Sequence, residues 1–184
     1  MHQTRKNIVA ISGSLKSTSS NTSILYSISE FADEDINFCI YDQLESIPPF
    51  NPEKENDFKE VQYLRHLLKE ADGVIISTPE YAFGVPGILK NALDWLVSSG
   101  ELNEKPVIAI SASPMYLGGD KALGSLLLTL GALGTKMDTN SSMSIPNIQN
   151  KITAGKVTDK QTLDDLKVIF SHLLKQMVIK TKQS

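Results

Sequence analysis

Four short runs rich in β-branched residues, separated by segments with helical spacing, constrain the fold of this chain of 184 residues more than any other feature. The runs lie at 7–12, 36–41, 73–78 and 106–111. Each has the length and the bounding residues of a strand. Strands that alternate with helices imply right-handed crossovers and a mainly parallel sheet covered on both faces. We therefore predict an α/β fold that forms a single domain over residues 1–184, with flexible ends at 1–6 and 182–184.

Apolar residues recur at helical spacing between the predicted strands. The later helices are predicted at 86–98, 119–134 and 159–181. Thr158 and Gln161 stand in capping-box spacing at the start of the last helix. A fifth strand is assigned by elimination within 136–145, because this segment is too polar to show a clear pattern.

The charges of the chain are nearly balanced, with 18 Lys and Arg against 21 Asp and Glu. They are spread along the sequence, so we expect neither a nucleic acid nor a membrane as a partner. The longest apolar stretch, 122–134, is shorter than the ~18–20 residues that span a bilayer. No apolar segment follows the charged start of the chain, so a cytoplasmic location is expected.

Cysteine and histidine offer little chemistry in this sequence. The single cysteine, Cys39, cannot form an internal disulfide, and its place within a predicted strand indicates a core residue rather than a nucleophile. His66 and His172 fall opposite the apolar stripes of their helices and are expected in solvent, while His2 lies in the N-terminal tail. We predict no metal site, and we assign no catalytic residue because neither a triad nor a carboxylate pair stands out.

Ligands of an open parallel sheet bind beyond the carboxyl ends of its strands, which directs attention to three loops. The loops lie at 12–21, 78–86 and 111–119. The first packs five Ser, one Thr and one Gly around a single Lys and runs directly into a predicted helix. It matches neither the P-loop nor the dinucleotide-binding glycine pattern, so a single terminal phosphate is the better ligand.

Polar side chains of the first loop suit a phosphate group. The helix N-terminus and Lys16 supply positive potential, and the side chains that could donate hydrogen bonds are those of Ser14, Ser19, Ser20 and Asn21. The alternative is a helix cap followed by a solvated turn, because serine is common in both.

The second and third loops could accommodate a flat ring. Between Pro79 and Pro86 the second loop carries Glu80, Tyr81, Phe83 and Gly84. A planar ligand could lie against these residues, although aromatic side chains more often pack over a sheet edge. The third loop ends in Gly118 and Gly119, which expose backbone amides and leave room for a ring system.

Together these segments resemble the NADPH-dependent FMN reductase family, which includes quinone, azo-dye and chromate reductases. GSLKSTSSN at 13–21 resembles the family's phosphate loop, and SASPMYLGG at 111–119 resembles its third loop. The most diagnostic stretch is PEYAFGVPGILKNALDW at 79–95. The resemblance implies a flavodoxin-like three-layer fold, with a five-stranded parallel sheet in the order 2-1-3-4-5 and helices on both faces.

The resemblance also implies roles for individual residues. Those expected to hold the FMN phosphate are Ser14, Lys16, Ser19 and Asn21. Those expected to line the isoalloxazine ring are Pro79, Glu80, Tyr81 and Ala82, with Ser111, Gly118 and Gly119 on its other side. The chain departs from the family at three positions. Lys16 replaces the usual Arg, and Ala82 and Gly84 replace the common Asn and Ser.

The activity implied is an FMN-dependent NAD(P)H oxidoreductase that passes hydride to flavin and then electrons to a small acceptor such as a quinone, azo compound, free flavin or metal oxyanion. Two alternatives remain open: a non-enzymatic electron carrier, and a binding protein for flavin or another phosphorylated ligand. Leu128 projects opposite Leu123 and Leu127, which predicts a subunit interface on the helices at 86–98 and 119–134. The resemblance implies that this interface forms a homodimer or homotetramer.

Overall fold

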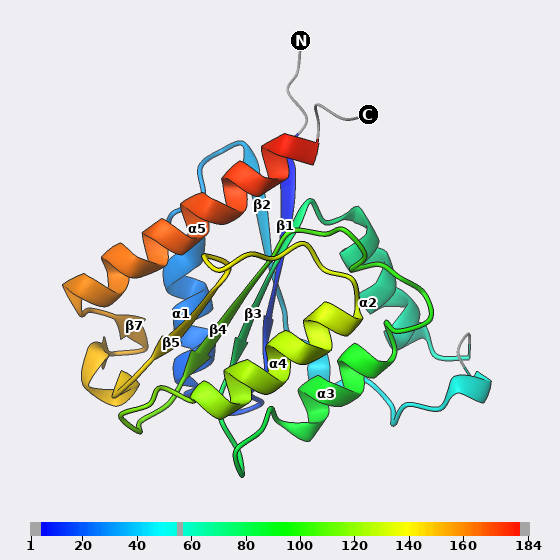
Figure 1. Cartoon of the computed structure of the whole chain (residues 1–184), viewed down its shortest axis with the longest axis horizontal. Coiled ribbons are helices and arrows are strands. Elements are labelled where there is room, and N and C mark those ends of the chain that lie inside the picture. The colour runs from blue at the N-terminus through cyan, green and yellow to red at the C-terminus, as the bar shows by residue number, and fades with distance from the viewer. Residues whose placement is uncertain (1–4, 55–56, 181–184) are drawn as a thin grey trace.

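The computed structural model describes residues 5–54 and 57–180 of the chain. Its centre is a parallel sheet (Figure 1) of five strands in the order β2-β1-β3-β4-β5. The strands are β1 Lys6–Ser12, β2 Ile36–Tyr41, β3 Gly73–Thr78, β4 Val107–Ala112 and β5 Ser142–Ile145. The predicted fold class and strand order are confirmed, and the fifth strand lies within the segment assigned to it by elimination.

Helices cover both faces of the sheet, as predicted. They are α1 Ser20–Ser29, α2 Lys59–Glu70, α3 Gly87–Asp94, α4 Asp120–Ala132 and α5 Lys160–Lys180. The helix predicted over 86–98 ends early, at Asp94, and the N–H of Leu96 then donates to the carbonyl of Leu93 over 3.1 Å in a tighter turn of the 3₁₀ type. None of the helices within the described residues is long and apolar enough to cross a bilayer.

The chain ends differ in part from the expectation of flexible tails. Lys6 is the first residue of β1, where its N–H donates to the carbonyl of Asp35 over 2.8 Å, so it belongs to the sheet. Residues 1–4, which include His2, and residues 181–184 lie outside the described part of the chain.

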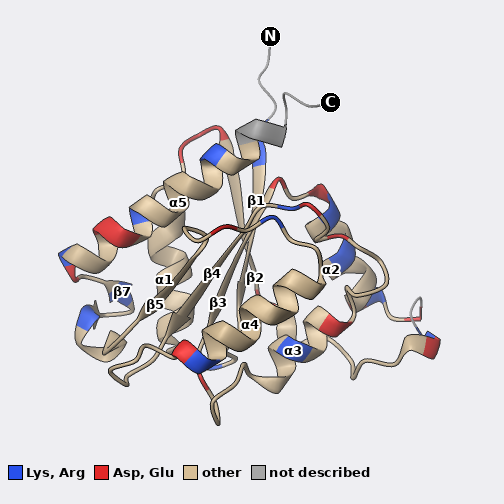
Figure 2. Ribbon diagram, in the orientation of Figure 1, with Lys and Arg blue, Asp and Glu red and all other residues tan. Residues whose placement is uncertain are grey.

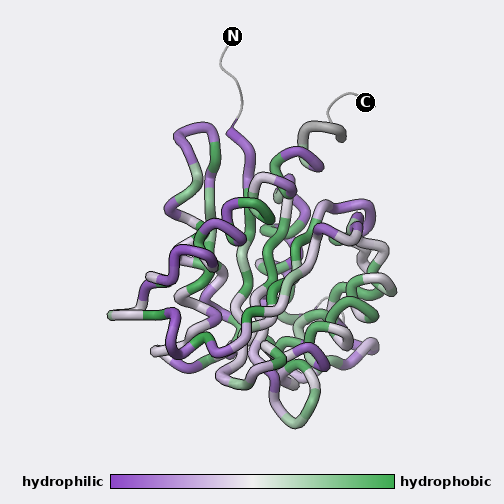
Figure 3. Tube along the Cα trace, turned by 60° about the vertical axis from the view of Figure 1, so that its left-hand side comes forward, coloured by the Kyte–Doolittle hydropathy of each residue, from purple (hydrophilic) through white to green (hydrophobic). Residues whose placement is uncertain are grey.

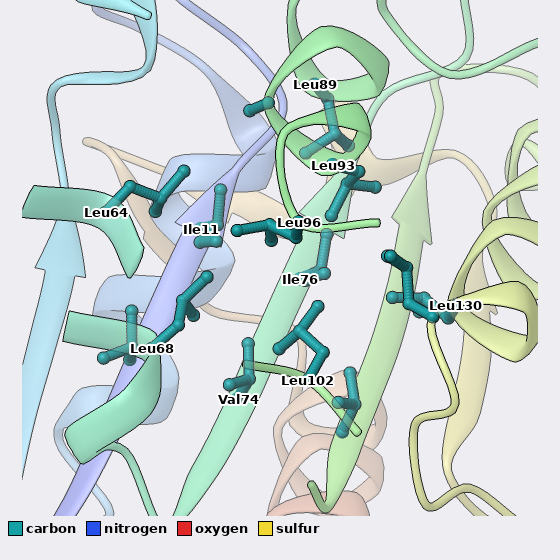
Figure 4. Close-up of a cluster of buried hydrophobic side chains, with 14 of the residues drawn as sticks. Ile11, Leu64, Leu68, Val74, Ile76, Leu89, Leu93, Leu96, Leu102 and Leu130 are labelled. Atoms are coloured by element: carbon teal, nitrogen blue, oxygen red, sulfur yellow. The ribbon is translucent and has the colours of Figure 1, made fainter. Parts of the chain in front are cut away.

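Two apolar cores lie on either side of the sheet. Helices α2, α3 and α4 pack on one face, and α1 and α5 pack on the other (Figure 1). Figure 4 shows Leu64 and Leu93 reaching toward Ile11 and Ile76 of the sheet. All six residues of β3 and of β4 are buried, because a parallel strand covered on both faces loses the in-and-out alternation. Lys6 is the one charged residue in these five strands (Figure 2).

The prediction that Cys39 is a core residue is wrong, because this cysteine lies on the edge strand β2. In β2 buried or half-buried positions alternate with exposed ones, and Cys39 is exposed rather than in the core. The sheet edge is less fully covered than its centre. Partial desolvation and the nearby Asp42 carboxylate still raise the pKa of the Cys39 thiol above its ordinary value. A raised pKa lowers the fraction of thiolate, the reactive form, at neutral pH. That Cys39 is no nucleophile stays a prediction.

The start of α5 corrects a second prediction. Asp159, not Thr158, caps this helix, because its Oδ1 accepts from the N–H of Thr162 over 2.9 Å and from the Thr162 hydroxyl over 2.6 Å. The Thr158 hydroxyl instead lies 3.2 Å from that of Thr153. Aspartate is as good an N-cap residue as threonine, so the sequence pattern could not separate the two.

A short antiparallel hairpin between β5 and α5 was not predicted. It consists of β6 Ile152–Thr153 and β7 Lys156–Val157, and it follows the 3₁₀ turn η3 Ile148–Lys151. Two further 3₁₀ turns, η1 Leu44–Ser46 and η2 Pro52–Lys54, lie between β2 and α2. The N–H of Val157 donates to the Ser27 hydroxyl over 3.2 Å, which attaches the hairpin to α1.

The diagnostic helix α3 anchors the segment after η1. The Trp95 ring is fully buried, and its Nε1 donates to the carbonyl of Pro48 over 2.8 Å. Asn91 donates to the same carbonyl over 2.9 Å and accepts from the N–H of Phe50 over 2.8 Å. These contacts give the Asn and Trp of the motif a structural role, which holds α3 against the loop that follows β2.

A buried lysine closes the carboxyl end of α2. Lys105 is 5 % exposed, and its ammonium donates to the carbonyls of Leu68, Lys69 and Ala71 over 2.6, 3.1 and 2.6 Å. These carbonyls belong to the last turn of α2 and the residue that follows, where a cation also meets the negative end of the helix dipole.

We expect Lys105→Met to lower the free energy of unfolding by about 2–3 kcal/mol, because buried carbonyls lose a charged donor. Urea unfolding of the purified variant measures this change. Lys69→Met, at an exposed position on the same helix end, is the control and should change stability by less than about 0.5 kcal/mol. Equal effects of the two substitutions would contradict the role given to Lys105.

Candidate functional site

The loops predicted to carry the chemistry meet beyond the carboxyl ends of the strands, at the lower edge of the molecule in Figure 1. They surround a cavity of about 150 Å³. The residues that line it are Ser14, Lys16, Thr18, Ser19, Ser20, Asn21, Pro79, Tyr81, Ala112, Pro114, Ile148 and Gln149. We call this space the carboxyl-end cavity. Seven of the fourteen predicted site residues line it, and Lys16 is its one charged residue.

Hydrogen bonds within the Ser-rich loop hold it at the start of α1. Ser19 is the N-cap, and its hydroxyl accepts from the N–H of Thr22 over 3.4 Å. The hydroxyl of Ser12 lies 2.8 Å from that of Thr22. The hydroxyl of Ser14 accepts from the N–H of Lys16 over 3.3 Å. The helix cap that the sequence offered as one alternative is therefore present, within the loop for which phosphate binding stays a prediction.

Asn21 connects this loop to the centre of the sheet. Its side chain is 3 % exposed, and both ends of its amide have protein partners. The Ser77 hydroxyl of β3 donates to its Oδ1 over 2.9 Å, and its Nδ2 donates to the carbonyl of Ala112 at the end of β4 over 3.4 Å. Asn21 thereby fixes the position of the loop relative to two strands.

The second loop forms a tight hairpin with a strained backbone. Tyr81 and Gly84 exchange N–H to carbonyl bonds of 3.0 Å in both directions. Ala82 and Phe83 stand between them with φ of 48° and 63°, the left-handed region that a two-residue hairpin turn requires. Neither residue has the freedom of glycine, so both carry a conformational cost.

The aromatic side chains of this hairpin point into solvent. Phe83 is 80 % exposed and Tyr81 is 56 % exposed, so the alternative that they pack over the sheet edge is wrong. Glu80, by contrast, holds the loop against α4. Its Oε2 accepts from the N–H of Ala122, in the first turn of α4, over 3.0 Å. The hairpin is thus fixed at Glu80 and open at its tip.

The third loop depends on glycine at Gly118, where φ is +66°. A Cβ there would stand 2.9 Å from the backbone of Ile145 and Pro146, so the close approach itself excludes a side chain. The fully buried Ser111 hydroxyl donates to the carbonyl of Gly118 over 2.9 Å. Ser111, Gly118 and Gly119 lie outside the set that lines the carboxyl-end cavity, and Ser111 and Gly118 shape the loop from within.

A fourth segment, which sequence reasoning missed, completes the cavity. Ile148 and Gln149 line it from the 3₁₀ turn that follows β5. Thr18, Ala112 and Pro114 also line the cavity and were not predicted, although they lie within the first and third loops. The proline and asparagine that directly follow the fifth strand are turn signals, and they could have identified this segment as a fourth carboxyl-end loop.

Exposed apolar side chains surround the cavity. Six of the large hydrophobic residues that are exposed in the described part of the chain lie on the three predicted loops, namely Leu15, Tyr81, Phe83, Met115, Tyr116 and Leu117. We call them the apolar rim. The lowest loop in Figures 1 and 3, which contains the hairpin, is pale to green on the hydropathy scale. Apolar residues gathered on loops at one end indicate a binding surface.

The donor set of the cavity fits the phosphate end of FMN. Lysine, serine and threonine side chains gather there, and no carboxylate is among the lining residues. The cavity of about 150 Å³ is smaller than the ~300 Å³ or more that encloses a whole cofactor-sized ligand. The cavity can therefore hold a part of a flavin cofactor, such as its phosphate, and not the whole of it.

Comparison with known proteins identifies the family of this chain. Residues 6–150 match the NADPH-dependent FMN reductase family. The chain belongs to this family. It is 32 % identical over 166 residues to the quinone reductase of Escherichia coli K12, which covers 86 % of this chain and 88 % of that protein. It is 40 % identical over 96 residues to the NADPH azoreductase of Bacillus sp. OY1-2, covering 51 % and 53 % of the two chains.

A solved structure has a similar fold. FerB of Paracoccus denitrificans, a flavoenzyme NAD(P)H:(acceptor) oxidoreductase, superposes with a TM-score of 0.79 at 26 % identity, covering 94 % of this chain and 97 % of that chain. The resemblance inferred from the sequence is confirmed. The relatives named here are reductases, and they give no support to a non-enzymatic electron carrier.

A larger cavity, of about 610 Å³, lies elsewhere, between β5 and α5. His172 lines this cavity. The sequence predicted this side chain in solvent, but its Nε2 lies 2.9 Å from Oδ1 of Asp138, so the histidine has a protein partner. The N–H of Asn140 and the hydroxyl of Ser141 hold the pKa of Asp138 below its usual range. The cavity lies beside the sheet rather than beyond its carboxyl ends, so we give it no part in the cofactor site. His66 is exposed, as predicted.

Ala82→Asn should raise the free energy of unfolding by about 0.5–1 kcal/mol, because asparagine tolerates left-handed backbone better than alanine. Urea unfolding measures the gain. Ala154 offers a matched control, since its φ of 50° places it before Gly155 in the equivalent turn of the β6–β7 hairpin, outside the set that lines the cavity. Ala154→Asn should give a similar gain. Stabilisation at residue 154 with destabilisation at residue 82 would contradict the assignment of strain to the φ of Ala82.

Proposed function

We propose that this chain is an FMN-dependent NAD(P)H oxidoreductase of small acceptors, in which residues 1–184 act as one FMN-binding domain. The observation that carries the proposal is a cationic, hydroxyl-lined cavity beside an open apolar hairpin in a member of the NADPH-dependent FMN reductase family. Bound FMN would supply the hydride chemistry, taking hydride from the nicotinamide and delivering electrons to the acceptor.

The phosphate end of the cofactor is assigned to the Ser-rich loop. Lys16 is exposed at the cavity and supplies the positive charge, while hydroxyls of Ser14, Ser19 and Ser20 and the free N–H groups of the first turn of α1 supply donors. Asn21 has its amide engaged with Ser77 and Ala112, so we propose that it positions the loop.

The flavin ring is assigned to the space between the second and third loops. On one side lie Pro79, Glu80, Tyr81, Ala82, Phe83 and Gly84, and on the other lie Ser111, Gly118 and Gly119. Glu80 and Ser111 hold these loops through bonds to Ala122 and Gly118, so they act by positioning. Hydride transfer between nicotinamide and flavin needs no protein acid or base, and no side chain is given that role.

The acceptor is proposed to be a flat conjugated molecule such as a quinone. Phe83 and Tyr116 expose 80 % and 74 % of their surface on neighbouring loops, and ring faces of this kind stack on planar molecules. Phe83 combines a strained backbone conformation with an exposed aromatic ring. Since the exposed ring adds little packing to offset the strain, a contact with ligand is the better reason for this conformation. A metal oxyanion would make little use of such a surface.

Visible absorbance tests the function directly. FMN added to the purified protein should bind, anaerobic NADPH or NADH should bleach the flavin band, and a quinone should restore it. Phe83→Ala should raise the KM for the quinone by a factor of about 3–10 and leave that for ferricyanide, which is not aromatic, nearly unchanged. Binding without bleaching by either nucleotide would favour a carrier or binding protein, and absence of binding would refute the proposal.

We expect Lys16→Met to weaken FMN binding by about tenfold or more and riboflavin binding by less than about twofold, because the lysine faces the phosphate. Lys16→Arg should strengthen FMN binding, since guanidinium can bond two phosphate oxygens at once. Quenching of flavin fluorescence measures both affinities. Lys59→Met, at an exposed site on α2, is the control. Equal losses for FMN and riboflavin would remove Lys16 from the phosphate site.

The chain is further proposed to be a cytoplasmic homodimer or homotetramer through α3 and α4. Leu128 on α4 is 80 % exposed and Val97, just after α3, is 64 % exposed, which agrees with an apolar contact surface. Leu128→Glu should shift sedimentation toward the monomer, because a charge would be buried at the interface. Val168→Glu on α5, where Val168 is 71 % exposed, should leave the assembly unchanged. A wild-type monomer would contradict the proposal.

A further inference from the structure

Gln149 is the one polar side chain that the fourth loop presents to the carboxyl-end cavity. It lies in the 3₁₀ turn after β5 and is exposed, while its neighbour Ile148 is 1 % exposed in the core on the α1 and α5 side. Both residues line the cavity together with Lys16 and the serines of the first loop. The buried isoleucine anchors the turn, which leaves the glutamine amide available at the cavity wall.

Hydrogen bonds fix this turn to the third loop. The N–H of Ile148 donates to the carbonyl of Ser113 over 3.2 Å, and the N–H of Asn147 donates to the carbonyl of Met115 over 3.2 Å. Asn147 itself has a φ of 52°, a left-handed position that asparagine tolerates and that turns the chain back toward the cavity. The place of Gln149 is therefore set by backbone bonds on its N-terminal side.

The chain on the other side of Gln149 is fixed as well. The carbonyl of Lys151 accepts from the N–H of Thr158 over 2.8 Å, which closes the base of the β6–β7 hairpin. The hairpin is bonded through Val157 to Ser27 of α1, the helix that begins at the phosphate loop. The turn that carries Gln149 is thus linked both to the third loop and to the element that holds the first.

We propose that Gln149 is a cofactor-binding residue that hydrogen-bonds the phosphate and ribityl end of FMN. A carboxamide both donates and accepts, so it matches a phosphate oxygen or a sugar-alcohol hydroxyl equally well. Lys16 and the hydroxyls donate from the first loop, and Gln149 closes the cavity from a separate segment. This inference rests on the proposed function, because it takes FMN as the ligand.

Titration of flavin fluorescence with wild type and variants tests the proposal. Gln149→Ala should raise the Kd for FMN by a factor of about 3–10, the effect of losing one neutral hydrogen bond. Asn150→Ala is the matched control, since Asn150 is exposed in the same turn but lies outside the cavity lining, and its Kd should stay within about twofold of wild type. A parallel riboflavin titration separates the two contacts: loss for FMN alone indicates the phosphate, and loss for both flavins indicates the ribityl chain.

Gln149→Glu provides a second variant with a larger expected effect. A carboxylate beside the phosphate should repel it, so FMN binding should weaken by more than in Gln149→Ala, and by more than riboflavin binding. Unchanged FMN binding in both Gln149 variants, or an equal loss in Asn150→Ala, would overturn the inference while the proposed function stands. Failure of the wild type to bind FMN would overturn the proposed function and this inference with it.

Discussion

Burial of the central strands on both faces is the constraint on which the rest of this structure depends. Every residue of β3 and β4 is covered, so the polypeptide can leave the sheet only at the strand ends. All five strands run in parallel, and their carboxyl ends therefore lie along one edge. The loops that carry hydroxyls, a lysine and aromatic rings meet at this edge because they have no other place to emerge.

The site combines a firmly held half with an open half. At the Ser-rich loop, proposed to hold the phosphate, the Asn21 amide bonds to β3 and to the end of β4, so the loop takes its position from the sheet itself. At the second loop, proposed to face the flavin ring, the Tyr81–Gly84 hairpin holds Ala82 and Phe83 in left-handed backbone and leaves the Phe83 ring in solvent. Both the backbone strain of the hairpin and the exposure of the Phe83 ring are unfavourable. A flat ligand on the apolar rim would offset the exposure, because it would cover the ring.

Errors of sequence reasoning occur where neighbours, not local pattern, decide the environment. Cys39 lies in a run as apolar as the central strands, yet β2 is an edge strand and two of its six positions, Cys39 among them, are exposed. Thr158 and Asp159 are both good helix caps, and only the hydrogen bond to Thr162 distinguishes them. The β6–β7 hairpin has strands of two residues each, which is too short for any period to appear.

The sequence by itself determined the α/β class and the three loops that reach the site, because strand and helix periods and loop composition are local properties. The strand order followed only from the resemblance to the family. Tertiary structure alone decided which side chains face the cavity and which hold the loops. Ser111, Glu80 and the Asn21 amide face inward to protein partners, whereas Gln149 arrives from a segment more than a hundred residues after Lys16. The physical reason is that a hydrogen-bond partner or an exposed face depends on which distant segments pack together, and residue type in the sequence does not record it.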